Sequence, residues 1–140
     1  MTTINPYVNF PGNTEKAFNF YKSVFGGEFL AVIRFKDTPE AARVPEDEKN
    51  KIMHIALPIG NNILMATDAL ESMGHTINSG NNYHISISPE SKEEAIRLFN
   101  ELSEGGIVHV PIEKMFWGYF GMFTDKFGIQ WMVNYDEKAN

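Results

Sequence analysis

Apolar side chains recur at the spacing of an α-helix between Glu15 and Phe25. The positions that share one side of such a helix are Ala17, Phe18, Tyr21, Val24 and Phe25. Asn13 stands where an N-cap is needed, and Gly26-Gly27 ends the pattern, because glycine readily adopts the left-handed conformation that closes a helix. The stripe is typical of a helix face buried against a sheet, which we favour over a surface that stacks on a cofactor.

A second segment of the same design follows Pro89. Ser91 and Glu94 have the spacing of a capping box, and Gly105-Gly106 ends the helical pattern. The apolar positions of this helix are Ala95, Leu98, Phe99 and Leu102. The sequence therefore predicts two amphipathic helices, each of which ends at a double glycine.

Each predicted helix is preceded by one short strand pattern and followed by three. The first strands are NPYVNF and NYHISIS, and the later ones are residues 29–35, 52–59 and 62–67, then 107–113, 118–124 and 129–135. β-Branched and aromatic residues dominate these runs, and the turn residues Gly60-Asn61 and 126–128 separate two pairs of them as hairpins.

The order β-α-β-β-β therefore occurs twice and indicates a tandem duplication within one domain of residues 1–140. We place the first repeat at about residues 3–68, a linker at 69–81 and the second repeat at about 82–136. Residues 36–51 and 66–82 are long for loops. Such loops are often lids or binding loops; we take the first as a mobile segment and the second as the linker.

The composition is that of a folded protein, with 43% hydrophobic and 21% charged residues. A net charge of −6 argues against nucleic acid or an anionic membrane as a partner. The absence of cysteine excludes disulfides, thiolate nucleophiles and cysteine-based zinc sites. No signal peptide or membrane span is recognisable, so we expect a cytoplasmic protein.

Three blocks of the sequence resemble the vicinal oxygen chelate superfamily, which includes glyoxalase I, extradiol dioxygenases and bleomycin- and fosfomycin-resistance proteins. The blocks are PYVNFPGNTEKAFNFYKSVFGGEF, KIMHIALPIGNNILMATD and EKMFWGYFGMFTDKFGIQWMVNY, and they resemble its PhnB-like branch most. The resemblance implies an α+β fold of tandem βαβββ repeats, with two curved mixed sheets around a cleft and the helices outside. It also implies a divalent metal in the cleft and a homodimer, with the cleft built within one chain or by exchange of repeats.

Some PhnB-like proteins carry a methyltransferase name. This chain has no glycine-rich turn from strand to helix of the kind that binds a nucleotide or S-adenosylmethionine, so we do not extend that activity to it.

In metal-dependent members of the superfamily, the ligands are His or Gln on the first strand, Glu on the fourth, His on the fifth and Glu on the eighth. The matching positions here are Asn5, Met65, His84 and Met132. One imidazole, one amide and two thioethers are a poor donor set for a hard or borderline divalent metal. A register slip of one residue brings no better ligand to the fourth or eighth strand. We therefore predict no metal and no other cofactor.

Strand alternation and the resemblance together predict residues that line a cleft for a small organic molecule. These ligand-binding candidates are Asn5, Tyr7, Asn9, Met65, Ser86, Trp117, Gln130, Met132 and Asn134. The alternative is that the same polar residues simply face water from an open antiparallel sheet. Trp117 is included because the resemblance places its hairpin beside the pocket; core or dimer contact is the alternative for this aromatic block.

His84 and His54 are the candidate catalytic residues, because a histidine with a suitable partner can act as a general base near neutral pH. A structural role is the alternative for His54, and we assign no role to His75 or His109.

Two functions remain. The first is a protein that binds a small organic molecule in a cleft without the standard metal site. The second is a lyase or isomerase, which is metal-free or holds a metal in an atypical way.

Overall fold

Two four-stranded mixed sheets, each with one α-helix, make up the computed structural model, which describes residues 1–137. The chain divides into unit 1, Met1–Asn78, and unit 2, which begins at Ser79. The elements of unit 1 are β1 (Tyr7–Phe10), α1 (Thr14–Phe25), β2 (Ala31–Arg34), β3 (Ile52–Ile59) and β4 (Asn62–Asp68). Those of unit 2 are β5 (Ile85–Ile87), α2 (Lys92–Ser103), β6 (Ile107–Lys114), β7 (Gly118–Thr124) and β8 (Gln130–Asp136).

Both sheets have the same topology, as a duplicated βαβββ unit requires. The strand order is β1-β4-β3-β2 in unit 1 and β5-β8-β7-β6 in unit 2. The first strand of each unit pairs in parallel with the last, and the other neighbours are antiparallel. The predicted α+β class and the tandem βαβββ repeats are confirmed, and the predicted strands differ from the observed ones mainly at their ends.

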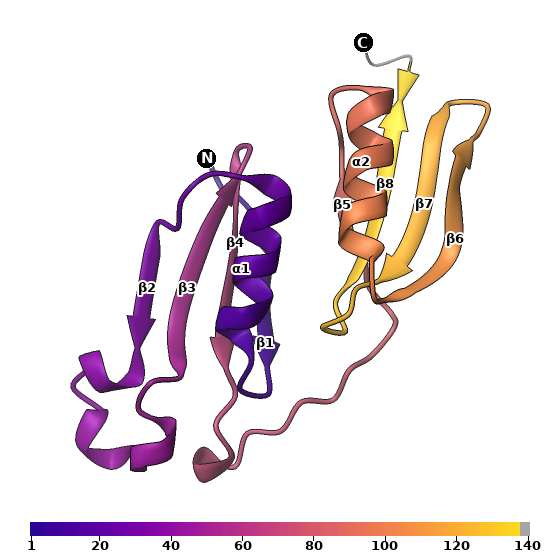
Figure 1. Ribbon diagram of the computed structural model, residues 1–140. Coiled ribbons are helices and arrows are strands. Elements are labelled where there is room, and N and C mark those ends of the chain that lie inside the picture. The colour runs from indigo at the N-terminus through magenta and orange to yellow at the C-terminus, as the bar shows by residue number, and fades with distance from the viewer. Residues whose placement is uncertain (138–140) are drawn as a thin grey trace. The chain divides into compact units, whose positions relative to one another are not determined.

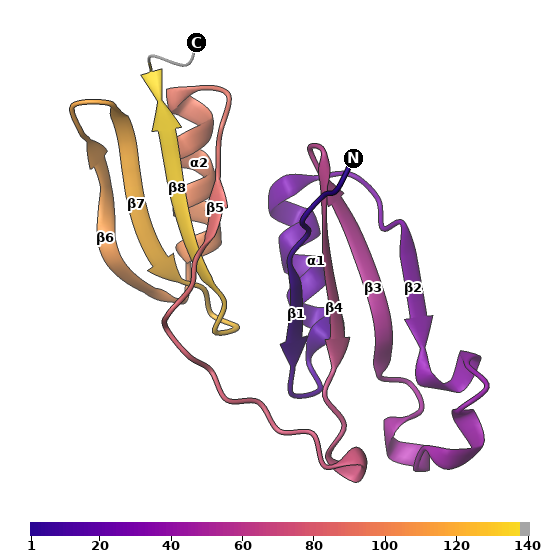
Figure 2. The same cartoon turned by 180° about the vertical axis from the view of Figure 1, so that it is seen from behind.

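Each helix packs against one face of its own sheet. Figure 1 shows α1 and α2 in front of their strands, and the opposite view in Figure 2 shows the strands of each unit in front of its helix. In both helices the predicted apolar stripe is buried, except that Phe25 is only half-buried. Beneath α1 the paired residues Ile55 and Ala66 are buried. In unit 2 the paired residues Phe123 and Trp131 are buried in the same way.

Because side chains alternate along a strand, the other face of each sheet carries the intervening residues. We call this side the helix-free face, since no α-helix of the same unit covers it among the described residues. In unit 1 the paired residues Tyr7 and Met65 lie on it, and in unit 2 the paired residues Ser86 and Met132 do. These four predicted binding residues therefore lie on the sheet faces to which strand alternation assigned them.

The two helices begin in different ways. The Ser91 side chain accepts a hydrogen bond from the Glu94 amide, and the Glu94 carboxylate accepts one from the Glu90 amide, so the predicted cap of α2 forms. Asn13 occupies the N-cap position of α1 but makes no capping bond with its side chain. The carboxylate of Asp68 substitutes for it from the end of β4, because it accepts from the amide and the hydroxyl of Thr14 at 3.0 and 2.6 Å.

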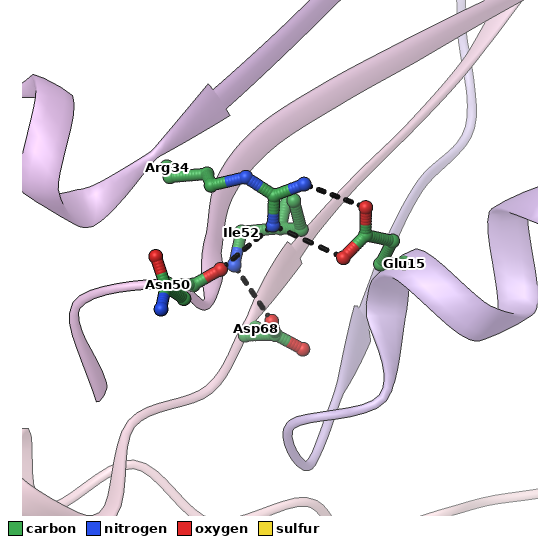
Figure 3. Close-up of polar contacts among 5 residues, drawn as sticks. All are labelled: Glu15, Arg34, Asn50, Ile52 and Asp68. Carbon is green, nitrogen blue, oxygen red and sulfur yellow. Dashed lines mark hydrogen bonds and ion pairs between the residues drawn. The ribbon is translucent and has the colours of Figure 1, made fainter. Parts of the chain in front are cut away.

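Asp68 also ties the start of β3 to the same helix terminus. Its second oxygen accepts a hydrogen bond from the Ile52 amide at 2.8 Å (Figure 3). Nearby, the Arg34 guanidinium donates to both carboxylate oxygens of Glu15 and to the Asn50 carbonyl. These contacts join β2, β3, β4 and α1 of unit 1 at one end of the sheet.

Residues 35–51 contain three short 3-10 turns, Phe35–Asp37, Ala41–Arg43 and Glu46–Glu48. A small apolar cluster of Phe35, Val44 and Leu70 is buried beneath them. The segment after β4 contains one 3-10 turn, Glu71–Met73, and Ser72 there donates to the buried carboxylate of Glu48. The long loop is therefore joined to the start of the linker by a hydrogen bond. No helix within residues 1–137 has the length and apolarity that crossing a bilayer demands.

The Asp68→Asn substitution should destabilise the protein by about 2–4 kcal/mol, because the amide cannot accept from Thr14 and Ile52 at once and turns its own donor toward one of them. The free energy of unfolding in urea measures this loss. Asp47→Asn, in an exposed position, is the matched control. Equal stability of the two variants would show that the Asp68 contacts do not hold unit 1 together.

Candidate functional site on the helix-free faces

Tyr7 and His54 meet on the helix-free face of unit 1. Tyr7 is opposite Met65, Met65 is opposite Ala56, and His54 lies two residues before Ala56 on β3. The Tyr7 ring therefore reaches diagonally across β4. Its hydroxyl lies 3.2 Å from Nδ1 of His54, and the two rings stack with centroids 5.8 Å apart at an interplanar angle of 28°. The pairing supplies the partner that His54 needs for either a chemical or a structural role.

Desolvation alters the acidity of Tyr7. Partial burial raises the pKa of the Tyr7 phenol above its ordinary value, because burial disfavours the phenolate. The neighbouring strand residues Met65, Ala56 and Ile33 on this face are not ionisable. Tyr7 is accordingly a neutral hydroxyl group that can donate and accept hydrogen bonds.

Two predicted asparagines border this face. Asn9 is exposed on β1 and lies opposite Thr67 on β4. Asn5 precedes β1, and its side-chain oxygen accepts a hydrogen bond from the Ile63 amide at 2.8 Å. The Asn5 carboxamide thus fastens the start of the chain to β4, whereas Asn9 presents its amide on the open surface.

In unit 2, Trp117 is held rigidly between β6 and β7. Its indole N–H donates to the side-chain oxygen of Asn134 at 2.7 Å, and its carbonyl accepts from the Glu137 amide. The ring makes edge-to-face contacts with Phe116 and Phe120, and Phe120 lies opposite Asn134 in the sheet. Two of the predicted binding residues, Trp117 and Asn134, therefore form one element of the helix-free face.

The remaining candidates of unit 2 have different surroundings. Ser86, Met132 and Met122 form a row across β5, β8 and β7, in which Ser86 is exposed and both methionines are half-buried. Gln130 is buried, and its amide nitrogen donates to the carbonyls of Gly80 and Tyr83, so it holds the segment that precedes β5. His84 lies half-buried one residue before β5.

Sequence reasoning named no ligand-binding candidate on β7, the third strand of unit 2. Met122 and Phe120 share the helix-free face with Met132 and Asn134, and strand alternation on β7 could have identified them. His109, to which we assigned no role, contacts the Thr124 hydroxyl through Nε2 at 2.7 Å. The pairing of β6 with β7 is irregular around His109, an irregularity that the sequence gives no means to foresee.

The residues present do not fit the divalent metal that the superfamily implies. The Asn5 oxygen already accepts the Ile63 amide, and Met65 and Met132 offer only thioethers. Within residues 1–137 the structure brings no three His, Asp or Glu side chains together as a metal-binding group. The donor chemistry therefore gives no basis for a step that passes through a metal.

Comparison with known proteins identifies the family. The sequence model of the Glyoxalase/Bleomycin resistance protein/Dioxygenase superfamily matches residues 3–133. Protein YjdN of Escherichia coli (strain K12) is 30% identical over 140 residues, which cover 94% of this chain and 93% of YjdN.

Solved structures agree with this result. The crystal structure of protein PA1353 from Pseudomonas aeruginosa is 42% identical and has a TM-score of 0.86, with 97% of this chain and 98% of that chain covered. The PhnB protein from Bacillus cereus, described as a putative 3-demethylubiquinone-9 3-methyltransferase, is 22% identical with a TM-score of 0.76, over 96% and 99% of the two chains.

The chain belongs to the glyoxalase/bleomycin resistance/dioxygenase superfamily, as its resemblance predicted. Within that superfamily it is YjdN-like in sequence, and it shares its fold with the PhnB protein.

The raised pKa of Tyr7 should be visible in a titration. Its phenol should ionise above pH 10, the ordinary value for tyrosine, and the Tyr7→Phe variant assigns the signal in ¹³C spectra of ring-labelled protein. As the pH rises, the Tyr7 phenol ionises first in the unfolded chain. Below about pH 10 it therefore leaves the free energy of unfolding unchanged, and above that pH it lowers the free energy of unfolding. Ionisation of Tyr7 at or below its ordinary pKa would contradict the assignment.

Proposed function

We propose that the protein binds a small, largely apolar organic molecule on the helix-free faces of its sheets, without the metal site of its superfamily. The observation that carries the proposal is the mixture of side chains on these faces. In unit 1, Tyr7 and Asn9 share the helix-free face with the thioether of Met65. In unit 2, Asn134 shares the corresponding face with the thioether of Met132. Sites for small molecules typically combine an apolar lining with a few placed polar groups.

The methionines support this kind of ligand. An unbranched, polarizable thioether adapts to ligands of different shape, and Met122 and Met132 lie directly opposite each other in the sheet. Beside them, Trp117 supplies a flat aromatic surface whose orientation is fixed by Asn134. A planar or partly aromatic molecule would gain contact area there with little loss of side-chain freedom.

The start of α1 argues against the methyltransferase activity in the name of the Bacillus cereus protein. The Asp68 carboxylate already accepts the Thr14 amide at this terminus. The connection from β1 to α1 contains a single glycine, Gly12, rather than a glycine-rich loop. This region therefore lacks the features with which strand-to-helix turns hold a nucleotide-like cofactor.

The second candidate function is a metal-free lyase or isomerase. The observation that favours it is the contact between Tyr7 and His54, since a histidine with a positioned partner is a suitable general base. His84 remains a further candidate base on unit 2, half-buried before β5.

A binding assay tests the proposal through Trp117. In a panel of small uncharged aromatic compounds, those that raise the melting temperature should also change the fluorescence of Trp117, and that change should be lost in Trp117→Phe. Met132→Ala should weaken binding about tenfold, because it removes apolar contact worth about 1.5 kcal/mol. Asn100→Ala, on the exposed side of α2, is the matched control and should bind as the wild type does.

Mass spectrometry of the recovered compound separates the two candidates. Binding with an unchanged compound supports the binding protein. A chemically altered compound, formed by the wild type and not by His54→Gln, supports the enzyme. If Met132→Ala and Asn100→Ala bind the same compound with equal affinity, the helix-free face of unit 2 is not the binding surface.

A further inference from the structure

We propose that Tyr7 and His54 form a proton-accepting site for a weakly acidic hydroxyl group, such as a phenol or an enol, on the bound molecule. The inference deepens the proposed function and rests on it, because it specifies the chemical class of ligand that the helix-free face of unit 1 recognises.

The geometry orients Tyr7 and His54 so that a proton can pass from the ligand through the tyrosine hydroxyl to the imidazole; we call this transfer the relay. In the tautomer of His54 that carries its proton on Nε2, Nδ1 is an acceptor, and the Tyr7 hydroxyl 3.2 Å away is the donor. The stacked rings hold this arrangement across β4. The oxygen of Tyr7 then has lone pairs with which to accept a hydrogen bond, and the residue is 46% exposed on unit 1, so a ligand can approach it.

The relay conserves atoms and charge. The ligand hydroxyl gives its proton to the Tyr7 oxygen while the Tyr7 proton passes to Nδ1 of His54. The products are a ligand oxyanion, which accepts a hydrogen bond from the re-formed Tyr7 hydroxyl, and a protonated imidazole. Because partial burial raises the pKa of the Tyr7 phenol, the tyrosine stays a neutral hydroxyl while it passes the proton on.

The surroundings select the class of ligand. Phosphates and carboxylates are already ionised near neutral pH, and anions of this type are normally held by arginine or lysine. The strand residues on this face include no such cation; Ile33, Ala56 and Met65 are its apolar members. An acidified phenol or enol instead arrives uncharged and crosses apolar surface readily. It can yield its proton to an imidazole when its own pKa lies near the ordinary imidazole value of about 6.5.

The repeat in unit 2 lacks this arrangement. By register, Ser86 occupies the place of Tyr7, and Phe120 on β7 occupies the place of His54. The two faces have therefore diverged, one toward proton transfer and the other toward aromatic and thioether contact. A purely structural Tyr7–His54 contact would make no distinction between a ligand with an acidic proton and its methyl ether, and this difference supplies the test.

The probes are 4-nitrophenol and 4-nitroanisole, which have the same ring and differ in the acidic proton. At a pH just below the pKa of the phenol but above the ordinary imidazole value of about 6.5, most of the dissolved phenol is protonated and a free imidazole can still accept a proton. Under these conditions equilibrium dialysis against the full chain should show about tenfold tighter binding of the phenol than of the ether, the equivalent of one good hydrogen bond. The absorption band of the phenolate should appear on binding. In Tyr7→Phe both probes should bind alike and the band should be absent, whereas Tyr83→Phe, an exposed tyrosine of unit 2, should behave as the wild type.

His54→Asn tests the proton transfer separately from the hydrogen bond. An asparagine oxygen can accept from Tyr7 but takes no proton, so the preference for the phenol should partly persist while the phenolate band disappears. Equal binding of the two probes to the wild type, or a phenolate band that persists in both variants, would overturn the inference and leave the proposed function standing. Failure of both probes to bind would also overturn it, and the Trp117 assay would still decide the proposed function.

Discussion

Burial of one sheet face beneath one amphipathic helix is the interaction on which each unit depends. The stripe of α1 covers the face that carries Ile55 and Ala66, and the stripe of α2 covers the face that carries Phe123 and Trp131. A single helix covers only one side of a sheet, so most of the intervening residues on the other side stay exposed or half-buried, although Ala56 is buried there. This division of each sheet gives the chain two surfaces on which chemistry can be placed without disturbing its core.

The polar contacts at the end of unit 1 connect that core to the proposed site. Asp68 joins the start of α1 to the Ile52 amide, and Ile52 lies two residues before His54 on β3. The buried carboxylate of Asp68 thus anchors the start of the strand that carries the imidazole. The structural residues and the proposed ligand-binding residues of unit 1 occupy opposite faces of the same strands.

Periodicity predicted most of the fold because each element has a clear pattern and a defined end. The stripe that ends at Gly26 and the capping box at Ser91 specify their helices locally, and the alternation around Met65 and Met132 assigns their faces correctly. Contacts between residues distant in sequence could not be read in this way. Asp68, rather than the predicted Asn13, accepts the hydrogen bond at the start of α1. Its place there depends on the register of β4 against β1, which no local sequence pattern encodes.

The same limit applies to the candidate site, where the sequence identified Tyr7 and His54 separately but not their contact across β4.

The central claim is that the chain holds its ligand without the metal of its superfamily. Elemental analysis of protein purified without chelators tests this claim most directly. We expect zinc, nickel, iron and manganese each to be far below one equivalent per chain, both as purified and after incubation with each metal followed by desalting. One equivalent of any of them, bound through His84 and lost in His84→Ala, would contradict the account.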